Sequence, residues 1–496
     1  MQRKQLTLVI VSLLVVVLSV SLAWFTTQII GKGKNLNVTS ANLQIVFTDS
    51  DGALTETDIE PGWSATKTFT IKNDTKTEYK YNIVIKDLLN TFVTEGYLQY
   101  KITSTNDGYN MTEFKDIPKS SVATDTILAY SVVIPNGVTQ SYTIEFKYTN
   151  DESVDQSDDM GKKLSGTLFI TEGTEDPNKT LLTQLLVDKS TKLTRTDFSK
   201  VLTNDNTNTL YTSTEDSKTV YYFAGNATDN WVKFGKNESN QDLYWRIIRT
   251  NSDGGVRLLY HGTSTTATDA VINASTAFNS SYNNIASVSY MYGSLGGILN
   301  ARENTTNSTI KTIIDNWYKD NLNTNYGKYL STTAVYCNDR STSDNYEFGA
   351  YTRLDTNKTP TYDCATTEDK FTVDTSTGNG KLTYPIALMT ADEVAFAGGV
   401  DATNAETWYY YNSANGSSTG STWWWLLSPY FWDDRYAFVF GVDGSSSPGR
   451  LASYRVGSTY GVRPAISLKS CVKYSTGNGS ASDPYTIKET ETETGC

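Results

Sequence analysis

Hydrophobic and polar positions alternate along residues 36–172, which is the pattern of half-buried β-strands. Turn-forming residues such as Glu60-Pro61-Gly62 and Pro135-Asn136-Gly137 separate several of these runs. Several short strands without a strong helical pattern favour an all-β sandwich. The predicted strands are ATKTFTIKN (65–73), YNIVIKD (81–87), LAYSVVIPNG (128–137), SYTIEFKY (141–148) and SGTLFIT (165–171).

A mixed α+β pattern covers residues 220–488. The run LYWRIIRTNSDGGVRLLYHG predicts two strands joined by a turn at residues 251–255. The stretch STIKTIIDNWYKDNL predicts a helix, and its apolar residues at helical spacing are Ile310, Ile313, Ile314 and Trp317. Lys311, Asp315 and Lys319 are expected to point away from the core and to complement one another's charge.

A second, shorter helix begins at Thr390 and ends at Gly398-Gly399. Thr390 and Glu393 have the spacing of a capping box, in which each side chain accepts a hydrogen bond from the other residue's backbone. Before this domain, residues 173–219 are polar and are predicted to form a linker with a short helix at residues 181–186. Residues 489–496 are predicted to be a tail.

Residues 1–31 contain the uncharged stretch LTLVIVSLLVVVLSVSLAWF after Arg3 and Lys4, which predicts export. Ser21 and Ala23 are small residues spaced as before a signal cleavage site, so the segment is either a cleaved signal peptide or a retained membrane anchor. In both cases the rest of the chain is expected outside the membrane, secreted or displayed at the cell surface, and to contact the membrane only through this segment.

Charge excludes one class of partner. The net charge of the 496 residues is −12, so no basic stripe is available to neutralise phosphates, and nucleic acid is not expected as a ligand. Aromatic residues make up 12% of the chain, which is rich in Thr, Ser and Asn. This composition is typical of a secreted, β-rich surface protein.

Four cysteines in an exported chain favour disulfides over metal sites. Cys337 and Cys364 bracket a polar stretch that a disulfide would restrain, so we predict that they pair. Cys471 would then pair with Cys496. The alternative is that Cys496 is a free or intermolecular thiol at the end of the chain.

The first domain resembles the camelysin and biofilm-matrix-fibre type of bacterial surface protein. The resemblance covers residues 1–172 and depends most on EPGWSATKTFTIKN (60–73), with VIPNGVTQSYTIEFKY further on. It implies a jelly-roll-like β domain that serves in surface display or in self-assembly into fibres. The metalloprotease activity associated with camelysin does not carry over, because the chain has one histidine, His261, and no HExxH motif.

The second domain resembles the C-type-lectin-like domain of bacterial surface proteins. This fold is related to that of the formylglycine-generating enzyme and of variable proteins diversified by retroelements. The residues that carry the resemblance include WWWLLSP (423–429) and GVRPAI (461–466). It implies two helices flanking a twisted antiparallel sheet, with long loops converging on one face to bind a ligand.

Catalysis and bound cofactors are not expected. His261 at a strand end has no evident nucleophile partner. Asp433 and Asp434, which are neighbours in the sequence, are better explained as a solvated loop pair than as the two carboxylates of a glycosidase. The cysteines are better explained by a disulfide than by formylglycine-type chemistry. Calcium remains open, because Asp49–Gly52 and Asn204–Asn206 are rich in oxygen ligands without the twelve-residue EF-hand spacing.

The candidate ligand-binding surface follows the WWWLLSP run. Trp423, Trp424 and Trp425 cannot all face one side of a strand, so at least one is expected in the core. The next residues mix aromatic groups with charge, a composition typical of binding hot spots. The predicted ligand-binding residues are Tyr430, Phe431, Trp432, Asp433, Asp434, Arg435, Tyr436, Tyr454, Arg455 and Tyr460.

Part of this surface has the composition of a diversified segment. Retroelements that randomise the first two bases of AAC-type codons cannot produce Lys, Glu, Gln, Met or Trp, and residues 433–460 contain none of them. Residues 251–300 contain only Met291 of these types, so local composition explains the pattern equally well.

The sequence therefore predicts an exported bacterial surface protein without enzymatic activity. Its lectin-like domain is expected to bind an extracellular protein or glycan. The alternative is a structural fibre or biofilm-matrix subunit without a dedicated ligand, assembled through the β-sandwich.

Overall fold

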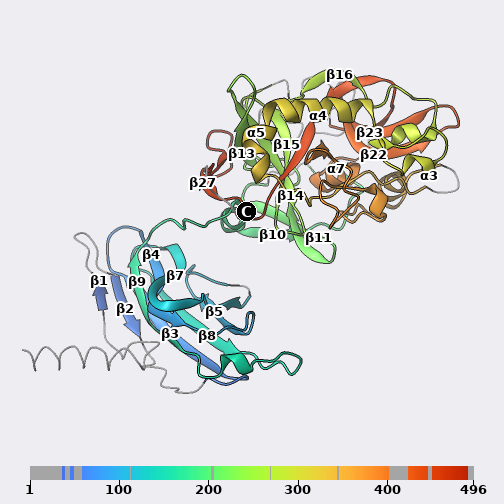
Figure 1. The fold of residues 1–496 in the computed structure, drawn as a ribbon. Coiled ribbons are helices and arrows are strands. Elements are labelled where there is room, and N and C mark those ends of the chain that lie inside the picture. Colours follow the sequence, from blue (N-terminus) through green and yellow to red (C-terminus); the bar gives the residue numbers. More distant parts are fainter. Residues whose placement is uncertain are drawn as a thin grey trace, which may run out of the picture. The chain divides into compact units, whose positions relative to one another are not determined.

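A computed structural model describes residues 36–38, 45–49, 59–111, 113–202, 206–267, 270–342, 346–400, 423–444 and 449–489. The chain divides into two compact units, Met1–Pro177 and Asn178–Cys496 (Figure 1). Both are built mainly from β-strands arranged in several sheets, so the predicted β-rich character is confirmed. The apolar segment 1–31 lies outside the described residues. Among those described, no helix is long and apolar enough to cross a membrane.

The first unit contains two antiparallel sheets. One has the order β1-β2-β3-β8-β5-β6 and the other has the order β7-β4-β9. The strands of the first sheet are β1 (Leu36–Val38), β2 (Ile45–Asp49), β3 (Ser64–Asn73), β8 (Thr139–Tyr148), β5 (Leu98–Ser104) and β6 (Lys115–Asp116). Those of the second are β7 (Ser120–Ile134), β4 (Tyr79–Asn90) and β9 (Leu164–Glu172).

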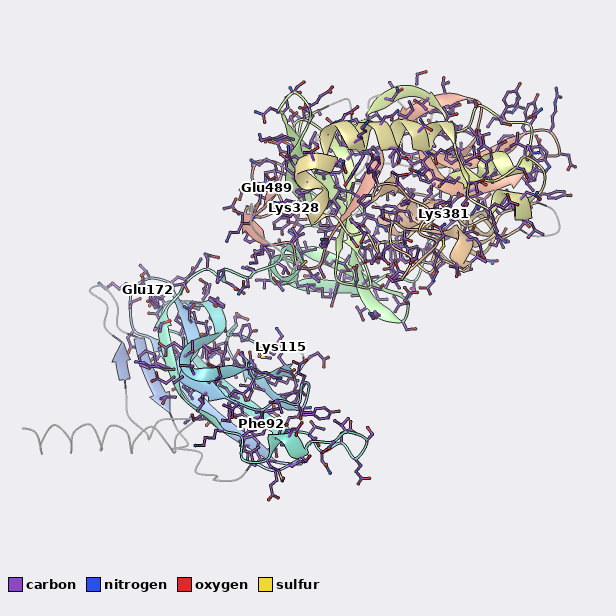
Figure 2. All side chains as sticks on the ribbon, in the orientation of Figure 1. Phe92, Lys115, Glu172, Lys328, Lys381 and Glu489 are labelled. Atoms are coloured by element: carbon purple, nitrogen blue, oxygen red, sulfur yellow. A yellow bond between two sulfur atoms is a disulfide. The ribbon has the colours of Figure 1, made fainter. Side chains whose placement is uncertain are left out.

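Both sheets contribute to one core, which the alternating pattern of the sequence anticipates. Phe69 and Ile71 of β3 are fully buried, together with Ile83 of β4 and Ile170 of β9. Phe92, labelled in Figure 2, belongs to the same core. The predicted strands at residues 65–73, 81–87, 128–137, 141–148 and 165–171 correspond to β3, β4, β7, β8 and β9. Their boundaries agree within a few residues, except that β7 begins at Ser120, well before predicted residue 128.

The second unit is organised around a large sheet with the order β10-β11-β12-β14-β13-β28-β27, which β15, β26 and β21 extend from β14. Its strands are β10 (Thr191–Thr194), β11 (Thr209–Glu215), β12 (Lys218–Tyr222), β13 (Trp231–Lys236), β14 (Asp242–Thr250), β15 (Val256–Gly262), β21 (Ile386–Leu388), β26 (Pro464–Leu468), β27 (Tyr474–Thr476) and β28 (Tyr485–Ile487). The strand pair expected around residues 251–255 is β14 and β15.

A separate sheet has the order β16-β25-β22-β23-β24 and carries the aromatic run of the sequence. Its strands are β16 (Asn273–Ala277), β25 (Thr459–Val462), β22 (Trp424–Trp432), β23 (Ala437–Val442) and β24 (Leu451–Arg455). Two short ladders complete the unit, formed by β17 (Met291–Tyr292) with β18 (Thr306–Asn307) and by β19 (Tyr336–Cys337) with β20 (Lys370–Phe371).

The segment predicted as a linker, residues 173–219, contributes ordered elements to the second unit. Its short helix is present as α2 (Leu181–Asp188), in which Leu181 and Leu185 are buried in the core. It also supplies β10 and β11, and β12 begins at its end. Strand β10 shows no alternation of buried and exposed positions, because it is exposed along its whole length, and pairing with β11 is what defines it.

The long predicted helix is α4 (Thr309–Asn321), capped by Ser308, whose side chain accepts a hydrogen bond from the Lys311 backbone. The expectation that Lys311 and Asp315 point away from the core is wrong: they are 0% and 8% exposed. Lys311 Nζ lies 2.5 Å from Asp315 Oδ2, so the two charges neutralise each other inside the protein. The sequence misleads here because i,i+4 charge pairs usually mark a solvated helix face.

The remaining helices are short. They are α3 (Ile298–Ala301), α5 (Asn323–Tyr326), α6 (Gly349–Tyr351) and α7 (Ala391–Ala397). Single 3₁₀ turns occur at η1 (Ser157–Asp159), η2 (Ile285–Val288), η3 (Gly327–Tyr329) and η5 (Thr367–Asp369), and η4 (Thr352–Asn357) is a short π-helix. Helix α7 is the helix that the capping box of Thr390 and Glu393 predicts, and both reciprocal hydrogen bonds of the capping box are present.

The predicted disulfide between Cys337 and Cys364 is confirmed and joins residues 27 positions apart. Cys471 is also disulfide-bonded, whereas Cys496 lies outside the described residues. A largely buried disulfide fits an oxidising, extracellular environment.

Removing the Cys337–Cys364 disulfide is expected to destabilise the second unit. For a loop of this length, the lost restraint on the unfolded chain corresponds to about 3–4 kcal/mol. The free energy of unfolding of the full chain, measured by denaturant titration, should fall by that amount in the double variant Cys337→Ser/Cys364→Ser. If the double variant unfolded at the same denaturant concentration as the wild type, a stabilising role of the disulfide would be contradicted.

Candidate functional site

The aromatic run forms a β-hairpin whose two ends differ in exposure. Strand β22 pairs antiparallel with β23, which pairs in turn with β24. Residues 424–429 are buried, residues 430–432 are half-buried, and residues 433–435 in the turn are exposed. The hairpin therefore has one end in the core and the other at the surface.

Trp425 fixes the buried end. Its side chain is 0% exposed, and its indole Nε1 donates a hydrogen bond to the backbone oxygen of Thr276 at 2.7 Å. The ring also packs edge-on against Phe278, with 5.9 Å between centroids. Trp424 is buried as well, on the other side of the strand, with the Arg463 guanidinium 5.2 Å from its ring centre. Adjacent tryptophans thus pack on opposite faces of β22.

The exposed turn is shaped by Asp433. Its Oδ1 accepts hydrogen bonds from the backbone nitrogens of Arg435 at 2.9 Å and Tyr436 at 2.5 Å. Asp434 adopts a left-handed backbone conformation with φ of 65°, which Asp tolerates better than most residues. Asp433 therefore has a structural role in the turn, and it places Arg435 and Tyr436 at the surface.

Six residues form what we call the aromatic–arginine patch, and Tyr436 is central to it. The Arg455 guanidinium lies 4.0 Å from the centre of the Tyr436 ring, and that of Arg435 lies 4.9 Å from it. Tyr282 stacks on Tyr436 with 6.1 Å between centroids and 24° between planes. Phe431 and Phe438 face each other across β22 and β23. The patch consists of Tyr282, Phe431, Arg435, Tyr436, Phe438 and Arg455.

Strand register explains how the patch is assembled. Phe438 is directly opposite Phe431 on one side and Arg455 on the other, so the three side chains share a face of the sheet. Tyr282 reaches the patch from a loop and packs on Gly457, where an added Cβ would lie 2.9 Å from the ring. A residue larger than glycine at position 457 would therefore push Tyr282 off Tyr436.

The other predicted ligand-binding residues do not join the patch. Tyr454 and Tyr460 pack with Trp423 and Trp425 in a separate aromatic cluster, and Tyr454 is buried. Tyr430 packs edge-on against Tyr351, and its hydroxyl donates to Asp355 at 3.1 Å. The Trp432 backbone nitrogen donates to the Tyr346 oxygen at 3.2 Å.

Of the ten predicted residues, Phe431, Arg435, Tyr436 and Arg455 meet in one patch. Sequence reasoning missed two members of the patch. Tyr282 is distant in sequence, and no local signal indicates that it stacks on Tyr436. Phe438 could have been found from strand alternation, because it is two residues after Tyr436 and residues two apart in an extended chain point to the same side.

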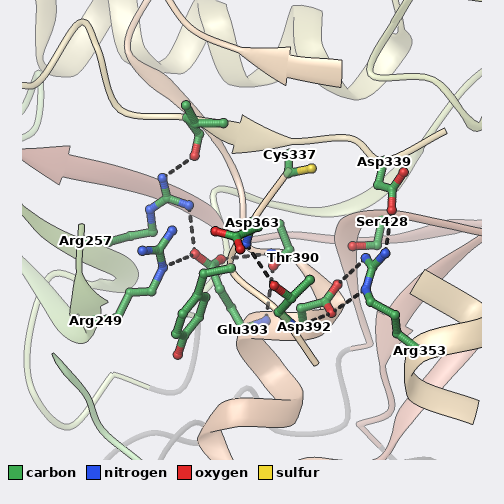
Figure 3. Close-up of a pocket in the computed structure, with 13 residues that line it drawn as sticks. Arg249, Arg257, Cys337, Asp339, Arg353, Asp363, Thr390, Asp392, Glu393 and Ser428 are labelled. Carbon is green, nitrogen blue, oxygen red and sulfur yellow. Dashed lines mark hydrogen bonds and ion pairs between the residues drawn. The ribbon is translucent and has the colours of Figure 1, made fainter. Parts of the chain in front are cut away.

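A buried ion-pair network lies elsewhere in the unit and surrounds Glu393 (Figure 3). Glu393 Oε1 accepts from Arg249 Nε at 2.9 Å and from Arg257 Nη1 at 2.7 Å, and Arg249 also pairs with Glu215 at 2.8 Å. Glu393 Oε2 accepts from the Thr390 backbone nitrogen at 3.0 Å, which closes the capping box. The network ties α7 to β11, β14 and β15.

A second set of ion pairs continues from the first. Arg353 pairs with Asp339 at 2.6 Å and with Asp392 at 2.9 Å (Figure 3). The cavity that these groups line together with Cys337 has a volume of about 20 Å³, enough for about one water molecule. The paired charges and the small volume indicate that these residues hold the fold together.

A larger cavity of about 290 Å³ lies in the first unit. Phe92, Leu98 and Ile117 form its apolar lining. At its rim, Glu95 pairs with Lys119 at 3.3 Å, so these charges compensate each other. The oxygen-rich stretches considered for calcium, Asp49–Gly52 and Asn204–Asn206, lie largely outside the described residues.

His261 is fully buried at the end of β15. Its ring packs edge-on against Trp231 with 4.4 Å between centroids, and Nδ1 lies 3.5 Å from Arg463 Nη2. These contacts give His261 a packing role in the core of the second unit.

The Glu393 network makes stability depend on pH. Burial by itself raises the pKa of Glu393, but Arg257 and Arg249 outweigh it, so the pKa is lowered overall. The pKa of Glu215 is lowered in the same way by Arg249. These two carboxyls therefore have lower pKa values in the folded state than in the unfolded chain. Their contribution to stability is present above the unfolded-state pKa and is lost as pH falls through the folded-state pKa values.

Glu393→Gln is expected to lower the free energy of unfolding by about 3–5 kcal/mol at pH 7, because it leaves buried arginine charge uncompensated. The wild type should lose stability as pH falls below about 4.3, the ordinary pKa of Glu, and the variant should lose less over that range. Denaturant titrations from pH 7 to pH 3 measure both effects. Identical pH dependence in the two proteins would contradict the assignment. Asp434→Asn is the matched control and should change stability by about 0.5 kcal/mol or less.

The two ends of the hairpin should respond differently to truncation. Trp425→Ala should cost about 3–5 kcal/mol of unfolding free energy, because it empties a buried site and orphans the Thr276 carbonyl. Tyr436→Ala should cost about 1 kcal/mol or less, because the ring is half-buried and lies at the surface. A large loss of thermal stability in Tyr436→Ala would show that the patch belongs to the core.

Comparison with known proteins gives a partial match. Residues 315–470 match a family described as a domain of unknown function, DUF6273, and this range contains α7 and the β22–β24 hairpin region. No curated protein matches the chain. One solved structure, titled "AvmM Catalyzes Macrocyclization in Alchivemycin A Biosynthesis", is 10% identical and covers 29% of this chain and 98% of its own. Its TM-score of 0.16 is too low to support an inference about fold or activity.

Proposed function

We propose that this protein is an exported cell-surface protein that binds an extracellular ligand, a protein or a glycan, through the aromatic–arginine patch. The patch itself is the observation that carries the proposal. It combines Tyr and Phe rings, which supply large contact area with little conformational freedom to lose, with Arg side chains, which supply directional hydrogen bonds. Its residues come from separate segments that meet at one exposed turn.

The arrangement of the hairpin supports a binding role. Trp425 and the buried part of β22 hold one end rigidly, and the Asp433 turn presents the other end. Recognition surfaces commonly consist of variable side chains on a rigid scaffold. The proposed role requires no catalytic group.

The domain assignments belong to the same proposal. The two-sheet first unit is proposed to be a jelly-roll-like β-sandwich that displays the second unit. The second unit is proposed to be a C-type-lectin-like domain, in which residues 433–460 are the segment open to retroelement diversification. Export is supported by the apolar segment at residues 1–31 and by the Cys337–Cys364 disulfide.

Ligand binding can be tested with labelled full-length protein applied to a glycan array and to intact bacterial and animal cells. We expect retention on at least one glycan or cell surface, and Tyr436→Ala should reduce it by about tenfold or more, as for a central hot-spot residue. Thr124→Ala, an exposed position in the first unit, is the control and should be retained like the wild type. Equal retention of wild type and Tyr436→Ala would contradict the proposal.

A further inference from the structure

The two arginines of the patch differ from the buried arginines of the second unit. Arg249, Arg257 and Arg340 are each ion-paired with a carboxylate. Arg435 and Arg455 are exposed, and within the described part of the chain neither guanidinium makes a hydrogen bond or ion pair. Their recorded contacts are with aromatic rings. In a chain with a net charge of −12, two arginines that contact the same tyrosine ring without carboxylate partners are unexpected.

Stacking on Tyr436 leaves the hydrogen-bonding edges of these guanidiniums available. A guanidinium held against a ring by cation–π attraction still has its N–H groups in its own plane. Such N–H groups bind carboxylate, sulfate or phosphate oxygens in pairs, with two parallel hydrogen bonds. Tyr436 therefore positions two oxyanion-binding groups next to aromatic side chains.

We propose that the patch recognises an acidic polysaccharide, whose sugar carboxylates are bound by Arg455 and Arg435. This inference rests on the proposed function and specifies its ligand. A carboxylated sugar unit has an apolar C–H face and an anionic group within one ring. The C–H face matches the half-buried rings of Phe431 and Phe438, and the carboxylate matches the adjacent arginines.

The size of the patch favours a saccharide over a protein partner. A stable protein interface uses about 20–30 residues on each side. Six side chains around a single turn correspond to the footprint of a few sugar units. A repeating polymer can also engage several displayed copies at once, which offsets the modest affinity expected of an exposed ion pair.

The negative charge of Asp434 should repel an anionic ligand, which allows the charge of the ligand to be tested. The Asp434 carboxylate is exposed next to Arg435, whereas that of Asp433 is engaged by two backbone nitrogens. A negative charge close to the bound carboxylate should weaken binding. Asp434→Asn is therefore expected to tighten binding, by about twofold at low ionic strength.

The experiment uses fluorescent oligogalacturonate, its carboxyl-reduced neutral counterpart of the same length, and a poly-glutamate peptide of equal charge. Fluorescence polarisation with the full chain gives the three affinities. We expect oligogalacturonate to bind about tenfold more tightly than either comparison probe, and about 500 mM salt to weaken it strongly. Arg455→Gln should weaken it about fivefold or more, and Arg455→Lys should restore little, because Lys lacks the planar fork.

Lys218→Gln is the matched control, since it removes one exposed positive charge from β12, outside the patch. It should bind like the wild type. Equal affinity for the neutral oligosaccharide would overturn recognition of the carboxylate and leave ligand binding by the patch intact. Tighter binding of poly-glutamate would overturn the saccharide assignment in favour of an acidic protein. Absence of binding to all three probes, with retention on cells still lost in Tyr436→Ala, would overturn this inference and leave the proposed function standing.

Discussion

The position of the aromatic–arginine patch depends on the carboxylate of Glu393. It neutralises Arg249 and Arg257, which lie on neighbouring strands of the large sheet, and it caps α7 through Thr390. Helix α7 is in turn linked to the sheet that contains β22, because the Ala391 backbone nitrogen donates a hydrogen bond to Ser428 Oγ of β22 at 2.9 Å. Buried ion pairs add little net stability over apolar packing, but an incomplete one is costly. The network therefore specifies one arrangement of α7 and β22. This arrangement fixes the buried end of β22, whose other end lies at the surface.

Along β22 the environment of successive residues changes from core to solvent. Trp424 and Trp425 are fixed on opposite faces by Arg463 and Thr276. Tyr430 and Trp432 are half-buried against neighbouring loops, and the Asp433 turn is exposed. Aromatic side chains serve both purposes because they bury large areas and also provide flat, rigid faces at a surface. The function proposed for the exposed end thus depends on packing at the buried end.

Local signals in the sequence predicted local features of the structure. The capping box of Thr390 and Glu393, helix α4, the Cys337–Cys364 pairing and most strands of the first unit follow from spacing, periodicity and cysteine arithmetic. Features that join distant segments could not be predicted in this way. Arg249 and Glu393 are 144 positions apart, and the stacking of Tyr282 on Tyr436 depends on a close approach at Gly457. The sequence places Tyr454 and Tyr460 with the turn because they are aromatic and close to it, whereas their rings pack against Trp423 and Trp425.

The turn at Asp433 has a consequence for how this surface can change. The backbone there is held by the Asp433 side chain and by the left-handed conformation of Asp434, and neither depends on which side chains occupy positions 431, 435, 436, 438 and 455. Substitutions at these five positions alter the chemistry presented to solvent and leave the buried tryptophans untouched. The side chains of the proposed binding surface and those that fold the hairpin are therefore separate residues, which makes the hairpin a natural starting point for selecting binders to new targets.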